Sequence, residues 1–320
     1  MILFDQKTPV DQLNDYLKNR INFLNKNEVL IDTEIPGEGN MNIVIRLITN
    51  QRSFILKQSR SFVAKYPKLS APLNRIDIEY NFYSQVGVNS FFPKVLKFDP
   101  KNYILFLEDL GNCQDLTSIY QTTIVPKDFI DKLITGLNYI HQQKISKVYP
   151  ENKLLRKLNH QHIFILPFIE NDIPLDHVQK GLKDLAKPFK TNKILFKKIS
   201  EAGKIYMEKG NTLLHGDYYP GSWIQLDKRL CIIDPEFSFL GPKEFDLGVM
   251  AAHIILTTGQ RLFFDLTIKN YQGKINVNMT KIYCGIEIIR RLIGLAQLPI
   301  KRTLKQKKNL LNLANNLILQ

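Results

Sequence analysis

The chain has 320 residues, which is long enough for one large domain or for two lobes. Hydrophobic residues make up 44% of it and charged residues 23%, a balance typical of a soluble globular protein and not of a disordered or membrane-spanning chain. Its formal net charge of +14 would attract phosphate-bearing ligands and nucleic acids alike, so charge alone selects no function.

The amino-terminal segment and the cysteines indicate the cellular compartment in which the protein is expected. Residues 1–20 contain three aspartates and no unbroken apolar run, which argues against a secretory signal and a membrane anchor. Cys113, Cys231 and Cys284 are far apart and form no C-x-x-C pair, so neither a zinc site nor a disulfide framework is expected. We therefore expect a cytoplasmic protein with reduced thiols.

The first third of the chain is predicted to be rich in strands. A short helix is expected first, with Thr8 as its N-cap and Pro9 at its first position. Several β-rich runs separated by turn residues then predict a small antiparallel meander that contains one helix. The expected strands are 29–35, 42–49, 52–58, 94–98 and 103–108, and the helix is 74–86.

Residues 109–112 interrupt this pattern and mark a hinge at about 108–112. We place a lobe boundary here, with a first lobe of residues 1–108 and a second lobe of residues 109–320. Beyond the hinge the chain is mainly helical, apart from a predicted hairpin of residues 223–226 and 230–233. The expected helices are 127–143, 192–209, 244–257, 281–297 and 304–319. The fold class is α+β, with a β-rich first lobe and a helical second lobe.

Acidic residues flank the predicted hairpin. Asp217 lies in LLHGDYYPGSW before the first strand, and Asp234 and Glu236 lie in DPEF after the second. A hairpin brings its two ends together, so we expect Asp217 and Asp234 to be neighbours, and two close carboxylates repel unless a cation is present. Magnesium usually binds one or two protein carboxylates together with water and phosphate oxygens. In an extended segment, Asp234 and Glu236 would point to one side, where both could bind this metal.

Asp217 is then available for a different task. Phosphoryl transfer uses an aspartate that orients the acceptor hydroxyl and takes its proton, and we assign this catalytic role to Asp217. Ser222, five residues later, offers a further oxygen for the metal. A plain surface turn is the alternative for Asp217, but His215 and the prolines and glycines nearby indicate a constrained loop.

Further segments of the chain extend this pattern over both halves. They are HGDYYPGS at 215–222, DPEFSFLGPKEFDLG at 234–248, GEGNMN at 37–42, FILKQ at 54–58, EDLGN at 108–112 and IRRLIGLAQ at 289–297. With these segments the sequence resembles the aminoglycoside phosphotransferase and choline kinase superfamily, and within it is most similar to the 5-methylthioribose kinases. The resemblance implies a protein-kinase-like, two-lobed fold, with a nucleotide-binding lobe in residues 1–108 and a catalytic and substrate-binding lobe in residues 109–320. It also implies ATP and Mg²⁺ as cofactors.

The resemblance also implies a set of nucleotide-binding residues. A glycine turn would approach the phosphates, a lysine would bind them beside a glutamate partner, and the hinge backbone would bind adenine. Taken singly, these features are equally typical of a hairpin turn, a solvated lysine and a plain connector. The implied residues are Gly37, Gly39, Asn40, Asn42, Lys57, Glu79, Glu108 and Leu110.

The remaining site residues concern the acceptor and the catalytic loop. In methylthioribose kinases a matching arginine pair binds the sugar and the transferred phosphoryl group, which implies this role for Arg290 and Arg291, although either could simply face solvent. His215 and Asp246 are expected to support the loop, and Asp246 could equally cap its own helix. His160 and His162 have no nearby metal-ligand partners, so we expect a structural role for them.

We therefore predict an ATP-dependent kinase that phosphorylates a hydroxyl of a sugar-like small molecule. The Tyr-Tyr-Pro that follows Asp217 departs from the Leu-His-Thr usual in methylthioribose kinases, which leaves the acceptor open. Aminoglycoside-type or choline-type phosphotransferases and a catalytically silent nucleotide-binding module are alternatives. A nucleic-acid binder is supported only by the net charge, no membrane partner is expected, and a homodimer is compatible with the sequence.

Overall fold

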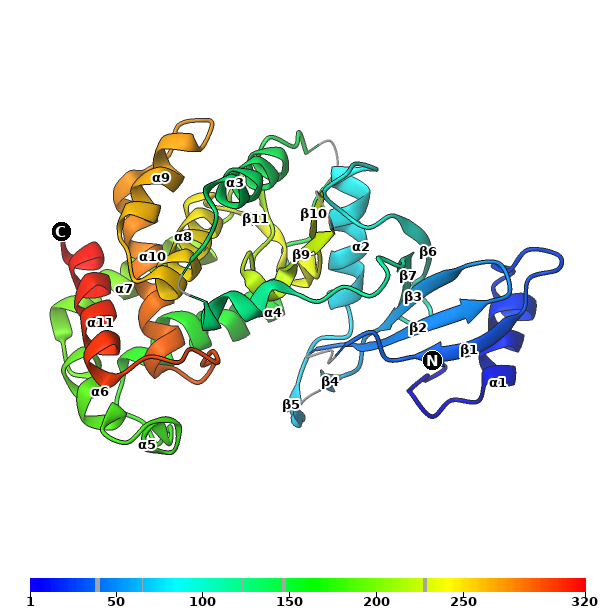
Figure 1. The fold of residues 1–320 in the computed structure, drawn as a ribbon, viewed down its shortest axis with the longest axis horizontal. Coiled ribbons are helices and arrows are strands. Elements are labelled where there is room, and N and C mark those ends of the chain that lie inside the picture. The colour runs from blue at the N-terminus through cyan, green and yellow to red at the C-terminus, as the bar shows by residue number, and fades with distance from the viewer. Residues whose placement is uncertain (38–40, 65, 123, 146–147, 227–228) are drawn as a thin grey trace. The chain divides into compact units, whose positions relative to one another are not determined.

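A computed structural model describes residues 1–37, 41–64, 66–122, 124–145, 148–226 and 229–320 (Figure 1). The chain forms two compact units. The first unit contains Met1–Gln114 and Ile224–Phe237, and the second contains Asp115–Trp223 and Ser238–Gln320. The first unit thus takes in a short segment from far along the chain. Within the described ranges, no helix is long and apolar enough to cross a membrane.

The first unit is built around an antiparallel sheet. Its elements in chain order are α1 (Val10–Asp15), the π-helical η1 (Tyr16–Arg20), β1 (Leu30–Glu34), β2 (Ile43–Thr49), β3 (Ser53–Gln58), β4 (Phe62–Val63), β5 (Tyr66–Ser70), α2 (Arg75–Val86), β6 (Val95–Asp99), β7 (Ile104–Glu108), β9 (Trp223–Leu226), β10 (Arg229–Ile232) and the 3-10 turn η6 (Pro235–Phe237). Five of the strands form one sheet in the order β1-β2-β3-β7-β6, and every neighbouring pair is antiparallel. The predicted hairpin is present as β9 and β10.

One face of the sheet carries the apolar core of this unit. Side chains two residues apart on a strand point to the same face, and alternate residues of the three central strands are buried together. Leu13 and Leu17 of the amino-terminal helical segment belong to the same core, so this segment packs on the sheet. The strand residues in the core are Ile45, Leu47, Phe54, Leu56, Ile104 and Phe106.

The amino-terminal helix begins differently from the prediction. Pro9 occupies the N-cap position and has no side-chain cap bond. Thr8 instead accepts a hydrogen bond from the backbone N–H of Asp5 at 2.8 Å. The predicted Thr8 cap is therefore wrong, because its hydroxyl closes the turn that precedes the helix.

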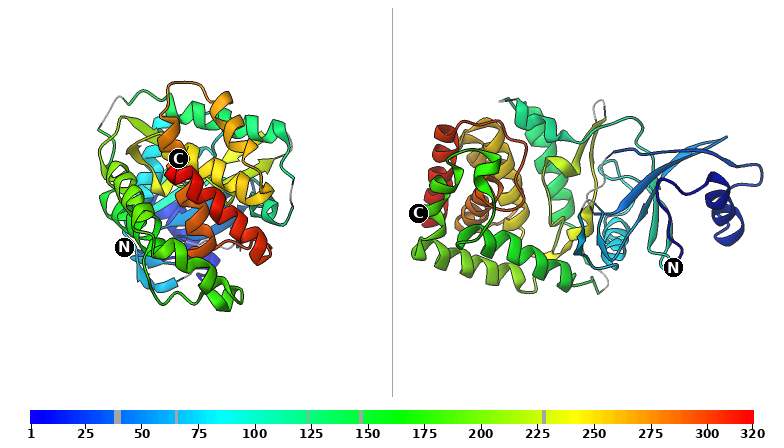
Figure 2. Two further views of the ribbon diagram at one scale, coloured as in Figure 1. Left: turned by 90° about the vertical axis from the view of Figure 1, so that its left-hand side faces the viewer. Right: turned by 90° about the horizontal axis from the view of Figure 1, so that it is seen from below.

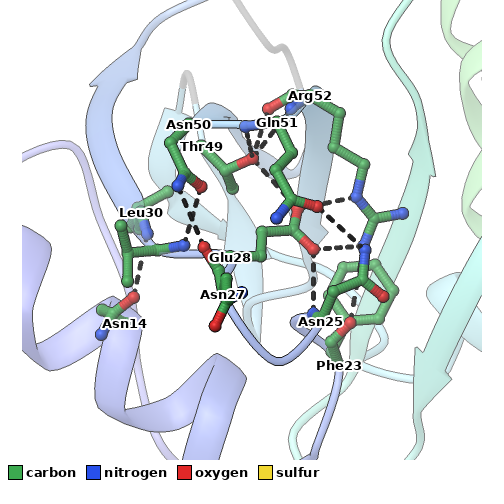
Figure 3. A network of polar contacts seen from close by, with 11 residues as sticks. Asn14, Phe23, Asn25, Asn27, Glu28, Leu30, Thr49, Asn50, Gln51 and Arg52 are labelled. Atoms are coloured by element: carbon green, nitrogen blue, oxygen red, sulfur yellow. Dashed lines mark hydrogen bonds and ion pairs between the residues drawn. The ribbon is translucent and has the colours of Figure 1, made fainter.

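A buried glutamate ties the segment before β1 to the turn between β2 and β3 (Figure 3). Glu28 is fully buried, and its carboxylate lies 2.8 Å from Nε of Arg52. The same carboxylate accepts hydrogen bonds from the hydroxyl of Thr49 and the backbone N–H of Asn25, both at 3.0 Å. Burial alone would raise the pKa of Glu28, but these donors, led by Arg52, hold it below its usual value. The network fixes one end of the sheet.

The second unit is mainly helical. Its elements are the 3-10 turn η2 (Leu116–Gln121), α3 (Lys127–His141), α4 (Lys153–His160), η3 (Gln161–Ile165), η4 (Leu166–Phe168), α5 (Leu175–Val178), α6 (Leu182–Lys190), α7 (Lys193–Met207), β8 (Thr212–Leu214), η5 (Pro220–Ser222), β11 (Phe239–Gly241), α8 (Glu244–Thr258), α9 (Leu262–Asn270), α10 (Val277–Ile293) and α11 (Leu304–Leu319). Helix α10 packs against both α8 and α11 (Figures 1 and 2). Nearly every residue of α8 is buried, so it is the central helix of this core.

Every predicted helix is present, most of them with shifted ends. Helix α10 begins at Val277, four residues before the predicted start, because Asn276 caps it through the backbone N–H of Met279 at 3.1 Å. Helix α11 has the predicted bounds, and Thr303 and Gln306 form a capping box at its start. The β-rich first unit and helical second unit confirm the predicted α+β class.

Candidate functional site

In the first unit, Lys57 connects two carboxylates. Its Nζ lies 2.8 Å from Oε1 of Glu79, which is on α2, and also forms an ion pair with Oδ1 of Asp234. Glu79 is fully buried, and Lys57 is buried on β3. Burial alone would lower the pKa of Lys57, but Asp234 and Glu79 raise it well above its usual range. Lys57 is therefore charged and held in place by both carboxylates.

The segment of Asp234 and Glu236 is a tight turn. Asp234 has a left-handed backbone with φ of 62°, and Pro235–Phe237 form the 3-10 turn η6. The prediction of an extended segment is therefore wrong, and in this turn a spacing of two residues no longer places both side chains on one side. The Asp234 side chain is 44% exposed, whereas Glu236 is buried.

Glu236 is bound by groups of its own unit. Its Oε2 accepts a hydrogen bond from Nδ2 of Asn42 at 3.0 Å and lies 3.3 Å from Nε of Arg75. Burial raises the pKa of Glu236 to about 8, although Arg75 acts in the opposite direction. Asn42, predicted to bind phosphate, is itself buried and also accepts from Ser59 and Arg75. Its amide is thus directed at Glu236.

Arg75 anchors the chain around this carboxylate. The arginine is fully buried at the start of α2, and its guanidinium donates to three backbone carbonyl groups at 2.6–2.8 Å. These carbonyls belong to Met41, Arg60 and Pro72. Arg75 therefore links Met41, which lies before β2, with Arg60, which follows β3, and with Glu236.

A magnesium ion is implied by the resemblance, and the residues fit it unequally. Asp234 offers a half-exposed carboxylate, the kind of oxygen donor that magnesium prefers. Glu236 would have to share or release its contacts with Asn42 and Arg75. In the part of the chain that the structure describes, no group of three or more His, Cys, Asp or Glu side chains could hold a metal by itself. Phosphate oxygens and water would have to complete the coordination.

The remaining nucleotide-binding predictions fall on the turn and the hinge. Gly39 and Asn40 lie outside the described residues, and a Cβ on Gly37 would meet nothing within 4 Å. Glu108 ends β7, where its carboxylate accepts from the backbone N–H of Lys94 at 3.0 Å. Leu110 follows it and is half-buried.

Arg46 holds this hinge segment, although the sequence did not indicate it. Its guanidinium lies 3.0 Å from the carboxylate of Asp109 and donates to the backbone carbonyl of Gly111 at 2.7 Å. It also donates to Asn112 at 3.0 Å. The backbone that the resemblance assigns to adenine binding is thus fixed by a buried cation.

In the second unit, the loop of Asp217 closes on itself. Gly216 has a φ of 84°, which favours glycine, and a Cβ on Gly221 would lie 2.3 Å from the Tyr219 hydroxyl. The Ser222 hydroxyl donates to the backbone carbonyl of Asp217 at 2.9 Å. Ser222, predicted as a metal ligand, is buried and contributes to this closed turn.

Asp246 holds the backbone of the same loop. Its two carboxylate oxygens accept from the backbone N–H groups of His215 at 2.7 Å and Gly216 at 3.0 Å. Helix α8 has no side-chain cap bond, so Asp246 contacts the loop and does not cap its own helix. The ring of His141 lies 3.3 Å from the Asp246 carboxylate, and its other nitrogen lies 2.9 Å from the hydroxyl of Tyr271.

Both predicted substrate arginines lie on α10 and share one carboxylate. Glu287 is one turn earlier on the helix and forms ion pairs with Nε of Arg290 and, at 2.7 Å, with Nε of Arg291. Nη2 of Arg291 lies 3.8 Å from Oδ1 of Asp217, and its guanidinium lies 4.9 Å from the ring centre of Tyr219. Neither arginine is exposed to solvent by more than 8%.

The electrostatics of Asp217 suit a base at neutral pH. Burial raises the pKa of Asp217 to about 6, while Arg291 and Arg290 oppose this rise and Glu287 and Asp246 add to it. A carboxylate with this pKa is ionised at neutral pH and can still accept a proton from a hydroxyl as it reacts. The side chain is 26% exposed.

The structure assigns the predicted carboxylates to different units. Asp217 belongs to the second unit, and Asp234 and Glu236 belong to the first. Their predicted convergence on one cation stays a prediction. The ring of His160 packs against that of Phe164 in a tilted arrangement with ring centres 5.3 Å apart, and the pKa of His162 is lowered by burial and by Arg290.

Sequence reasoning missed Arg75 and Glu287. Glu287 had a local signal, because a glutamate three and four residues before two arginines on a helix predicts ion pairs. Arg75 had none, because its partners are backbone carbonyl groups, the amide oxygen of Asn42 and an acid 161 positions later in the numbering.

Comparisons with known proteins identify the family. Residues 33–273 match the model of the phosphotransferase enzyme family. The chain belongs to this family. A methylthioribose kinase of Geobacillus sp. (strain WCH70) is 26% identical over an alignment of 343 residues. The alignment covers 89% of this phosphotransferase and 85% of the relative.

Solved structures of other phosphotransferases share the fold. The choline kinase LicA of Streptococcus pneumoniae has a TM-score of 0.52 at 17% identity and covers 96% of this chain and 98% of its own. A spectinomycin phosphotransferase in complex with ADP and spectinomycin has a TM-score of 0.53 at 14% identity, covering 98% and 100%. At these identities the likeness shows the fold alone, which confirms the predicted protein-kinase-like architecture.

Proposed function

We propose that this phosphotransferase moves the γ-phosphoryl group of ATP to a hydroxyl of a sugar-like small molecule. The observation that carries the proposal is the position of Lys57, held on β3 between Glu79 of α2 and Asp234. A strand lysine paired with a helix glutamate, beside an aspartate that can bind a metal, is the arrangement by which kinase-fold enzymes handle nucleotide phosphates. Lys57 would bind phosphate oxygens, and Asp234 would hold magnesium with the nucleotide.

Asp217 would act as the general base of the proposed reaction. In the proposed reaction the acceptor oxygen bonds to the γ-phosphorus, its proton passes to the Asp217 carboxylate, and the bond from phosphorus to the β–γ bridging oxygen breaks to leave ADP. Magnesium, when bound with the nucleotide, would neutralise negative charge on the phosphates. The Asp246 carboxylate holds the loop backbone so that Asp217 keeps one orientation.

The charges near Asp217 favour a neutral or anionic acceptor. Arg291 lies over the Tyr219 ring, the kind of aromatic surface that binds quaternary ammonium groups. Together with Arg290 it would repel a cationic acceptor such as choline or an aminoglycoside. The methylthioribose kinase relative at 26% identity supports a sugar with a free hydroxyl.

An ADP-release screen tests this proposal. The panel contains methylthioribose, other pentoses and hexoses, choline and an aminoglycoside, each with ATP and magnesium. We expect turnover with a sugar and none with the cationic compounds. Asp217→Asn should lower kcat by about 10²- to 10⁴-fold, because general-base catalysis contributes about this much, and leave the ATP dissociation constant unchanged.

Two outcomes would overturn the proposal. ATP binding without transfer to any acceptor would favour the silent nucleotide-binding module. Preferred turnover of choline or of an aminoglycoside would refute the argument from Arg290 and Arg291.

A further inference from the structure

A buried chain of hydrogen bonds leads from η2 through α8 to the arginine pair. The hydroxyl of Tyr120 lies 2.6 Å from Nδ1 of His253, and Nε2 of His253 lies 3.0 Å from Oε1 of Glu287. The same Oε1 accepts from Nε of Arg291 at 2.7 Å. Tyr120, His253 and Glu287 are each at most 1% exposed. Three elements thus contribute to one continuous polar chain inside the apolar core.

The order of donors along this chain is determined by its chemistry. Glu287 is ionised, because Arg290, Arg291 and the His253 hydrogen bond hold its pKa well below the usual range although burial alone would raise it. A carboxylate only accepts hydrogen bonds, so Nε2 of His253 must donate to it. Burial lowers the pKa of His253 to about 4, which leaves the ring neutral and Nδ1 free to accept from Tyr120. Each member therefore fixes the orientation of the next.

The chain ends on an arginine that is held from several sides. Besides Glu287, Arg291 donates from Nη1 to the backbone carbonyl of Ala296 at 3.3 Å and lies over the Tyr219 ring. Nη2 is the part that lies near Asp217. Arg290 forms its ion pair with the other oxygen of Glu287 and has no described contact with Asp217 within ion-pair distance.

We propose that Tyr120, His253 and Glu287 are positioning residues that hold the Arg291 guanidinium beside Asp217. The effect of these three residues on phosphoryl transfer rests on the proposed function, whereas their effect on the orientation of Arg291 does not. A preorganised cation at this point costs no side-chain rearrangement when charge develops on the acceptor and the phosphoryl group. The geometry further distinguishes the two arginines, because only Arg291 is both held by this chain of hydrogen bonds and close to Asp217.

The first test follows the Arg291 Nε–H by NMR hydrogen exchange in the full-length protein without substrate. Tyr120→Phe and His253→Leu remove links of the chain, and we expect each to speed this exchange about tenfold as the guanidinium gains freedom. Tyr283→Phe is the matched control, because it deletes a buried hydroxyl on α10 that contacts Ala202 at 3.2 Å and not the arginines. Unchanged exchange in both chain variants would overturn the proposal, whatever the activity of the protein.

The second test measures kcat and KM with the acceptor found in the ADP-release screen. We expect the two chain variants to lower kcat by about 10- to 100-fold, the size of effect that a misplacement of about 1 Å produces, with the KM for ATP unchanged. His253→Gln can still accept at its oxygen and donate at its nitrogen, so it should recover part of the loss and serves if His253→Leu does not fold. Faster Arg291 exchange with unchanged kcat would refute positioning for the reaction. If wild type transfers nothing, the proposed function fails, and the exchange test still decides the role of the chain.

Discussion

Replacing Lys57 with methionine would separate its structural role from its proposed role in nucleotide binding. Methionine keeps the length and apolar contacts of the side chain but removes the ammonium group that joins Glu79 to Asp234. Glu79 is fully buried, so its carboxylate would then lack a cation where water cannot replace one. Asp234 is half-exposed and would be affected much less.

The cost of this substitution has an upper limit. Breaking a buried ion pair by removing one partner costs about 3–5 kcal/mol. Glu79 can escape the penalty by binding a proton, and for a carboxyl with an ordinary pKa of 4.5 this costs about 4 kcal/mol near pH 7.5. We therefore expect Lys57→Met to lower the unfolding free energy of the first unit by about 3–4 kcal/mol.

The double variant Lys57→Met/Glu79→Gln tests the cause. Glutamine has the shape of glutamate without its charge, so the double variant should regain most of the lost stability and lie within about 1 kcal/mol of wild type. ATP binding should stay weaker by about 10- to 100-fold in both variants, because one charged hydrogen bond contributes about 1.5–3 kcal/mol. Amide exchange of β3 and β7 during urea titration measures the stability, and calorimetry measures the binding.

Two results would refute this reasoning. A double variant as unstable as Lys57→Met would show that the loss comes from packing and not from the uncompensated Glu79 charge. Wild-type ATP affinity in the double variant would remove Lys57 from the proposed nucleotide site.

Two further predictions concern the first unit. Glu28→Gln should lower the unfolding free energy by about 2–3 kcal/mol at pH 7, because Arg52 and two other donors lose a buried anion. The folded pKa of Glu28 is lowered, so this stabilisation is fully present above pH 4.5. The difference from wild type should therefore shrink as the pH falls through the folded pKa. Glu34→Gln is the control, since the ion pair of Glu34 is half-exposed and should contribute at most about 1 kcal/mol. Equal losses of unfolding free energy in the two variants, measured by chemical denaturation, would contradict the stabilising role of Glu28. Arg75→Lys keeps the charge but loses the planar guanidinium that holds three carbonyl groups. We expect faster amide exchange in residues 41–44 and ATP binding about tenfold weaker. Unchanged amide exchange would contradict this role of Arg75.

Periodic segments of the sequence determined most of the fold. Residues 42–58 and 103–108 alternate apolar and polar side chains or form short buried runs, and they became the central strands of the sheet. The pair β4 and β5 was not predicted, because β4 has only two residues and leaves no periodic signal. Helices α4 to α6 were missed for a related reason, since π-helical and 3-10 turns interrupt that region.

The electrostatic partners at the site could not be predicted from local sequence. The acidic DPEF segment suggested uncompensated carboxylates that need a metal, whereas Lys57 and Arg75 of the same unit already contact Asp234 and Glu236. These cations are more than 150 positions away in the sequence, and only the folded sheet and α2 bring them to the turn. The turn itself was misjudged because spacing two residues apart predicts a common side only in a strand.

The carboxylates around the Asp217 loop differ in what they can still bind, and this difference supports Asp217 as the base. Asp246 is fully buried and accepts from the loop backbone and from His141, while Glu287 is buried and accepts from both arginines and His253. Both oxygens of each group are therefore engaged by protein donors. Asp217 is 26% exposed, and its closest described cation is 3.8 Å away, beyond a normal hydrogen bond. Of these three carboxylates, Asp217 alone retains an oxygen that an acceptor hydroxyl can reach.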